Sequence, residues 1–87
     1  MTIDIATRVW RLGSMYIARA LPLDVSSAGA TPDAARAALR EAIALFVATA
    51  RDLGTIEEVL EECGYTQAHE RWHAPAIEPG VRESLVV

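Results

Sequence analysis

The sequence predicts an α+β domain in which a small antiparallel sheet is covered by one long helix. Two observations lead to this fold: strand-like alternation fills the first part of the chain, and an amphipathic helical run follows it. The chain has 87 residues, of which 52% are hydrophobic and 23% charged, as is typical of one folded domain. We therefore expect a single domain over residues 1–87, with a three-stranded sheet and the element order β-β-β-α-α-β.

The first two strands are predicted to form a hairpin. Residues 2–10 alternate as a half-buried strand does, with Ile3, Ile5, Thr7 and Val9 on one face. The turn signal Leu12-Gly13-Ser14 separates them from a second strand-like run, residues 15–21. Two faces of this second run compete for burial, and the sequence leaves both open: Met15, Ile17 and Leu21, or Tyr16, Ala18 and Ala20.

A third strand and the long helix follow. Pro22 ends the second strand because proline has no N–H to donate to a sheet, and residues 25–28 suit a short third strand. Thr31 can cap a helix that begins with Pro32, and Gly54 can end it, so we expect this helix from about Thr31 to about Leu53. Its predicted buried face comprises Ala35, Leu39, Ala42, Ile43, Phe46, Ala50 and Leu53.

A second, shorter helix is predicted after Gly54. Thr55-Ile56-Glu57-Glu58 matches a capping box, in which the side chains of Thr55 and Glu58 each accept a bond from the other residue's N–H. The apolar face of this helix comprises Ile56, Val59, Leu60 and Cys63, and Gly64 closes it. Beyond it, residues 71–73 and residues 83–87 are candidates for further strands, the last at an edge of the sheet.

Composition excludes several classes of function. The net charge is −4, and the eight arginines are spread along the chain, so we expect no direct nucleic-acid binding. No apolar run is long enough to span a membrane and no signal peptide opens the chain, which predicts a soluble, cytoplasmic protein without membrane contact. Aromatic residues make up only 6%, so the core is thin, and we expect burial against another subunit in a homodimer or tetramer.

Catalytic and metal-binding chemistry is not predicted. His69 and His73 are four residues apart, with Cys63 and Glu70 nearby, and on a helix such histidines can bind zinc. The segment is instead predicted as loop and strand, where that spacing separates the two rings, and Cys63 lies on the apolar face of its helix. The chain has no nucleophile motif and no phosphate-binding glycine loop. We expect no enzyme activity, no metal and no cofactor.

Three residues are nominated for contact with a partner protein. Glu61 and Glu62 belong to an acidic group that also includes Glu57 and Glu58, and this group is either a solvated helix face or a patch for a basic partner. Trp10 lies opposite the isoleucines of the first strand. It is either exposed as an interface anchor or covered by the C-terminal strand or the second helix.

Several segments resemble the HicB-like antitoxins. That family combines an aromatic residue followed by small residues in a strand, a Gly-x-Thr helix start and a Glu-Ala-Ile helix centre. The corresponding segments here are Tyr16-Ile17-Ala18, Leu21 to Val25, Ser27 to Ala35, Leu39 to Phe46, and Leu53 to Tyr65 followed by Trp72 and Ala74-Pro75. The resemblance extends over residues 14–77.

The resemblance implies a truncated ribonuclease-H-like fold without catalytic carboxylates. It also implies a role: such proteins bind a small basic toxin that cleaves mRNA, a HicA-like protein, and cover its active site. Many members carry an additional DNA-binding segment. Here few residues follow Tyr65, and they include Pro75, Pro79 and Gly80, so the chain departs from that pattern and the sequence leaves operator binding open. An alternative is an orphan homo-oligomeric scaffold or regulatory domain with no toxin partner.

Overall fold

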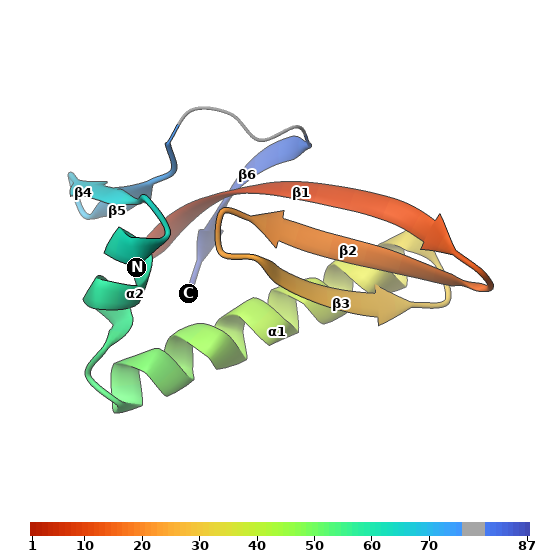
Figure 1. The fold of residues 1–87 in the computed structure, drawn as a ribbon, viewed down its shortest axis with the longest axis horizontal. Helices are drawn as coiled ribbons and strands as arrows, with labels where there is room; N and C mark the ends of the chain where they lie inside the picture. Colours follow the sequence, from red (N-terminus) through yellow and green to blue (C-terminus); the bar gives the residue numbers. More distant parts are fainter. Residues whose placement is uncertain (76–79) are drawn as a thin grey trace.

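The computed structural model describes residues 1–75 and 80–87, and Pro79 therefore lies outside the described part (Figure 1). It confirms the α+β class, but the predicted three-stranded sheet is too small, because six strands of the described residues form one mixed sheet. The elements in chain order are β1 (Thr2–Leu12), β2 (Met15–Leu21), β3 (Val25–Gly29), α1 (Pro32–Asp52), α2 (Ile56–Glu62), β4 (Thr66–Ala68), β5 (Arg71–His73) and β6 (Val81–Val86).

The long strand β1 organises the sheet. Its second half pairs with β2, and β2 pairs with β3, so β3-β2-β1 is the antiparallel unit that the sequence predicts. Thr2 and Ile3 pair with both β5, in parallel, and β6, in antiparallel orientation, so these two strands lie on opposite edges of β1. Ala6 and Thr7 pair with both β2 and β6. Strands β2 and β5 therefore share one edge of β1, and β6 occupies the other.

The β1–β2 hairpin settles which face of the second strand is buried. Gly13 and Ser14 form a two-residue turn, and Gly13 has φ +63°, a conformation that glycine adopts without strain. Ala18 pairs with Val9 and Ala20 with Thr7, on the face that α1 covers, and both alanines are fully buried. The Tyr16, Ala18 and Ala20 set is the buried one. The small residues let the helix approach the sheet closely.

Helix α1 begins and ends close to the predicted residues. The Thr31 hydroxyl accepts a bond from the N–H of Ala34 at 3.0 Å, as predicted for the cap. The buried side chains are Ala35, Leu39, Ile43, Val47 and Ala50. Leu53 was expected to be buried, but it is 71% exposed, and Val47 was missed. The buried row follows i, i+4 spacing from Ala35 to Val47 and ends at Ala50, while Leu53 lies after the last helical residue, at the C-cap.

Helix α2 forms where the sequence predicts it, but its N-terminus is not a capping box. The Thr55 side chain makes no cap bond, and its hydroxyl donates to the carbonyl of Ala50 at 3.4 Å instead. This bond joins α2 back to the last turn of α1. Leu60 is fully buried, and Ile56 and Cys63 pack against the core. The amphipathic prediction is confirmed, while the predicted Thr55–Glu58 exchange is wrong.

A buried tyrosine adds a further bond between the C-terminal part of the chain and β1, beside the strand pairing. Tyr65 follows α2, and its hydroxyl donates to the backbone carbonyl of Asp4 at 2.6 Å. Asp4 lies on the edge of β1 between the residues that pair with β5 and those that pair with β2, so this carbonyl has no strand beside it to bond. Trp72 on β5 is also buried and belongs to the same core cluster as Tyr65. The sequence did not reveal this role of Tyr65.

Replacing Tyr65 with phenylalanine is expected to destabilise the domain by about 1–2 kcal/mol, because the carbonyl of Asp4 then loses its partner. Burial raises the pKa of Tyr65 above its ordinary value of 10.0. The contribution of Tyr65 to stability is therefore complete below pH 10 and declines above it, as the unfolded phenol ionises first. Chemical denaturation at neutral pH and above pH 10 measures both effects, and Tyr16→Phe is the control.

Candidate protein-binding surface

Near the β1–β2 hairpin, the sheet face opposite α1 carries exposed apolar side chains. In Figure 1, strands β2 and β3 lie in front of the N-terminal part of α1, so this face is turned to the viewer. We call it the outer face. Near the hairpin it carries Trp10, Leu12 and Met15, which are 38%, 65% and 41% exposed, and the half-buried Ile17 paired with Trp10. Trp10 is therefore exposed rather than covered by β6 or α2, and its role as an interface anchor stays a prediction.

Two arginines border these apolar side chains. Arg8 and Arg19 are directly opposite each other in the β1–β2 register, and both are exposed. The Arg19 guanidinium lies 5.7 Å from the centre of the Trp10 ring, within the range of a cation–π contact. Its Nε also lies 3.5 Å from Oδ1 of Asp24. We name Trp10, Leu12, Met15, Arg8 and Arg19 the hairpin patch.

The sequence nominated Trp10 in this patch but missed the two arginines. Arg8 is two residues before Trp10 and so shares its strand face, which was a usable signal. Arg19 could be placed beside Trp10 only through the hairpin register, in which Leu12 pairs with Met15. Once the turn is limited to Gly13 and Ser14, this register follows.

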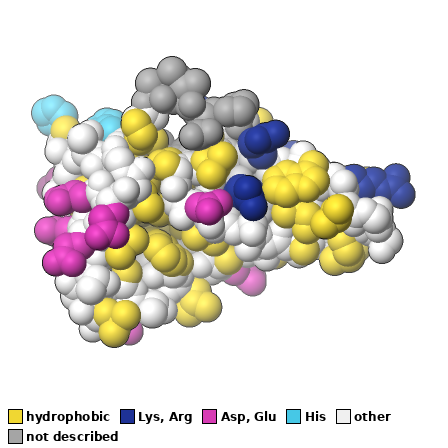
Figure 2. Space-filling model, in the orientation of Figure 1, with side chains coloured by type: hydrophobic (Ala, Val, Ile, Leu, Met, Phe, Trp, Pro, Cys, Tyr) yellow, Lys and Arg dark blue, Asp and Glu magenta, His cyan; other side chains and the backbone are white. Residues whose placement is uncertain are grey.

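The acidic residues of α2 form a second exposed region. Glu57, Glu58, Glu61 and Glu62 are all exposed, and none of them takes part in an ion pair with another described residue. Figure 2 shows acidic side chains gathered over α2, at the opposite end of the same view from the hydrophobic and basic side chains of the hairpin. The structure therefore does not bring Trp10 together with Glu61 and Glu62.

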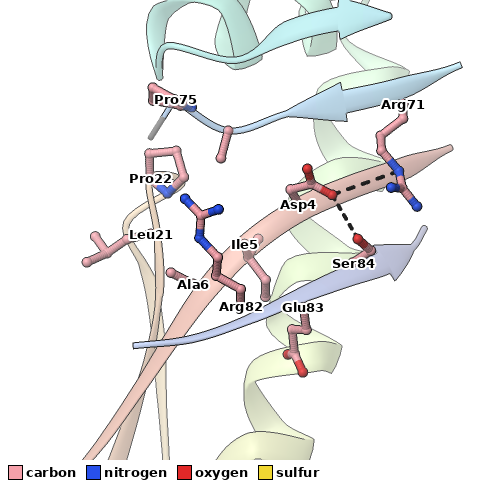
Figure 3. Close-up of a pocket in the computed structure, with 11 residues that line it drawn as sticks. Asp4, Ile5, Ala6, Leu21, Pro22, Arg71, Pro75, Arg82, Glu83 and Ser84 are labelled. Atoms are coloured by element: carbon pink, nitrogen blue, oxygen red, sulfur yellow. Dashed lines mark hydrogen bonds and ion pairs between the residues drawn. The ribbon is translucent and has the colours of Figure 1, made fainter. Parts of the chain in front are cut away.

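A small hollow lies between the β1–β5 and β1–β6 pairings (Figure 3). Its volume is about 200 Å³, and Asp4, Arg71, Arg82 and Ser84 contribute its polar groups. Asp4 is held from two sides: the Ser84 hydroxyl donates to its carboxylate at 2.8 Å, and Arg71 Nε lies 3.9 Å away. His73 Nδ1 is 3.6 Å from the other carboxylate oxygen. These contacts join β5 and β6 to β1, so the carboxylate has a structural role.

The residues considered for metal binding are separated. His69 and Glu70 form the turn between β4 and β5, while His73 lies on β5 opposite Thr66. Cys63 packs against the core, and burial raises the pKa of its thiol, which disfavours the thiolate that a nucleophile or metal ligand requires. Within residues 1–75 and 80–87, no group of three histidine, cysteine or carboxylate side chains is placed to hold a metal ion.

No protein-family model, curated protein or solved structure matches the chain. Among the described residues, no helix is both long and apolar enough to cross a lipid bilayer.

Proposed function

We propose that the chain is a non-catalytic protein-binding domain of the HicB-like antitoxin type. In this proposal it binds a small basic, HicA-like toxin and covers the active site with which that toxin cleaves mRNA. The contacts come from side chains on the surface, and no bond of the domain itself is made or broken. The proposal includes neither a cofactor nor operator binding.

The observation that carries the proposal is the unpaired acidic surface of α2. Glu61 and Glu62 lie in the last turn of the helix, where negative charge opposes the helix dipole and costs about 0.3–1 kcal/mol per residue when exposed. A basic partner would offset this cost and would be attracted by the four carboxylates. The acidic surface is therefore better suited to binding than to stabilising the isolated domain.

The fold supports the same proposal at a coarser level. The β3-β2-β1 unit is antiparallel, and α1 packs on its inner face, as the family resemblance implies. The ribonuclease-H-like description of this unit is part of the proposal, because β4, β5 and β6 enlarge the sheet beyond the three strands of that description. A cytoplasmic location, where the mRNA substrate of the toxin occurs, is also part of it.

Charge reversal of Glu61 and Glu62 tests the proposal. We expect the double variant Glu61→Arg, Glu62→Arg to bind the small basic protein encoded by the adjacent gene about tenfold more weakly at low salt, because two attractive charges become repulsive. The variant should remain folded, since arginine is favoured in the last turn of a helix. Isothermal titration calorimetry at low and high salt measures the effect.

A matched control is Glu41→Arg, an exposed carboxylate on α1. It changes the net charge in the same direction but leaves α2 intact, so binding of the basic protein should change little. The control changes the net charge by two units and the double variant by four, so a loss of binding free energy in the control about half that of the double variant would mean that net charge, rather than the α2 surface, determines binding. Absence of binding by the unmodified chain would contradict the proposal itself.

A second candidate function is self-assembly into a homo-oligomeric scaffold. Trp10, Leu12 and Met15 are exposed side by side on the outer face, and large apolar side chains grouped in this way are typical of interfaces. This observation favours an oligomer with or without a toxin partner.

A further inference from the structure

The two charged regions of the molecule lie on one face, at opposite ends of its longest dimension. The hairpin patch is at one end and the α2 glutamates at the other, and both are turned to the viewer in Figure 2. The molecule extends 39 Å along this direction and 28 Å across it. This arrangement limits how two copies can pack face to face.

The charges of the hairpin patch favour contact with a negatively charged surface. Arg8 and Arg19 are directly opposite each other, and like charges at opposed positions of an antiparallel pair repel. Within the described part of the chain, Asp24 is the only carboxylate within ion-pair distance of either arginine. The exposed Trp10 and Met15 lie beside them, so the surface that fits here is acidic and allows apolar contact.

We propose that a second copy of this chain supplies that cover, in a two-fold symmetric dimer that packs outer face against outer face. A half-turn about an axis across the longest dimension places α2 of one protomer over the hairpin patch of its partner. By symmetry, α2 of the partner covers the patch of the first protomer. Each dimer therefore makes the same contact between glutamates and arginines twice and closes without free ends.

The size of the face agrees with this arrangement. A standard protein interface buries roughly 800 Å² per partner, which fits on a face of 39 by 28 Å. A nucleic acid fits the patch less well, because Trp10 is the aromatic side chain that the patch offers for stacking, and the exposed glutamates of the same face repel phosphates. The inference rests on self-assembly, the second candidate function, and does not require a toxin. The dimer uses the same α2 glutamates as the proposed toxin contact, so a basic partner and the second copy would compete for them.

Complementary charge reversals test this dimer. One variant carries Arg8→Glu and Arg19→Glu, and the other carries Glu61→Arg and Glu62→Arg. In each variant both contacts of the homodimer become repulsive, so we expect dimerisation about tenfold weaker or more at low salt. In an equimolar mixture, the heterodimer has one native contact and one with both charges exchanged, so dimers should return. Sedimentation velocity of the purified full chain over a range of concentrations measures all three samples.

Dimers that form when the two variants are mixed would show that both variants are folded, because unfolded chains could not form them. Circular dichroism of each variant provides the separate check of folding. Several results would overturn the inference: a monomeric unmodified chain at all concentrations, a dimer that neither variant weakens, or species that grow beyond the dimer with concentration. Binding of a single-stranded oligonucleotide that is lost with Arg8→Glu and Arg19→Glu, by a chain that stays monomeric, would also overturn it and assign the patch to nucleic acid. None of these results depends on whether a basic protein binds α2.

Discussion

Ile43→Ala is expected to destabilise the domain by about 4 kcal/mol, the largest effect of any substitution considered. The Ile43 side chain is 0% exposed and lies near the middle of α1, in the cluster that also contains Ala18 and Ala20 of β2. Its replacement removes three buried carbon groups and leaves a cavity, because a helix packed on a sheet can collapse only in part. A domain of 87 residues has only about 4–13 kcal/mol of stability, so the loss is large.

Urea denaturation followed by circular dichroism measures this effect, at one protein concentration for all variants because self-assembly would add to the apparent stability. Leu45→Ala is the matched control. Leu45 is two residues further along α1 and 69% exposed, so its replacement should change the free energy of unfolding by less than about 0.5 kcal/mol. Equal effects of the two substitutions would mean that α1 does not pack on the sheet through the Ile43 side.

Gly29→Ala is expected to destabilise the domain by about 3 kcal/mol, the upper end of the range for overpacking. A Cβ atom at residue 29 would lie 2.5 Å from the backbone nitrogen of Ala35 and 2.7 Å from the carbonyl carbon of Ala34. These are backbone atoms in the first turn of α1, so they can move only if the helix shifts away from β3. Differential scanning calorimetry or urea denaturation measures the loss.

Gly54→Ala is the control, because it measures the cost of backbone strain without a steric collision. Gly54 has φ +72°, and a Cβ atom there would have open space within 4 Å, so the substitution brings strain alone and should cost about 1 kcal/mol. Gly29 does not occupy the left-handed region, so its substitution brings the collision alone. If Gly29→Ala proved as mild as Gly54→Ala, the close approach of β3 to α1 would be wrong.

Local signals in the sequence were sufficient for the N-terminal part of the fold. Gly13 marked the hairpin, and Thr31 and Pro32 marked the start of α1, because each acts on the residues next to it. The error at Leu53 arose because a helical wheel continues the buried stripe to the end of the run, whereas Leu53 lies after the last helical residue, at the C-cap. The error at Thr55 arose because its hydroxyl had a second acceptor, the carbonyl of Ala50.

The pairing of strands that lie far apart in the sequence could not be predicted from the sequence. Strand β4 was missed because all three of its residues are exposed and show no alternation, and its turn to β5 places His69 and Glu70 at positive φ without glycine. The parallel pairing of β5 with β1 joins residues about seventy positions apart. The same limit applies to part of the surface: Trp10, Glu61 and Glu62 could each be nominated, but their separation depends on that topology. The position of Arg19 beside Trp10 depends only on the register of the β1–β2 hairpin.

The most direct test of the proposed antitoxin function is the RNA cleavage rate of the small basic toxin that the proposal requires, sought as the product of the adjacent gene and measured while this chain is added. Coverage of an active site predicts that cleavage falls in proportion to the added chain and stops at a fixed stoichiometry. The Glu61→Arg, Glu62→Arg variant should require a higher concentration for the same inhibition. Cleavage that continues unchanged in the presence of excess chain would contradict the proposed function.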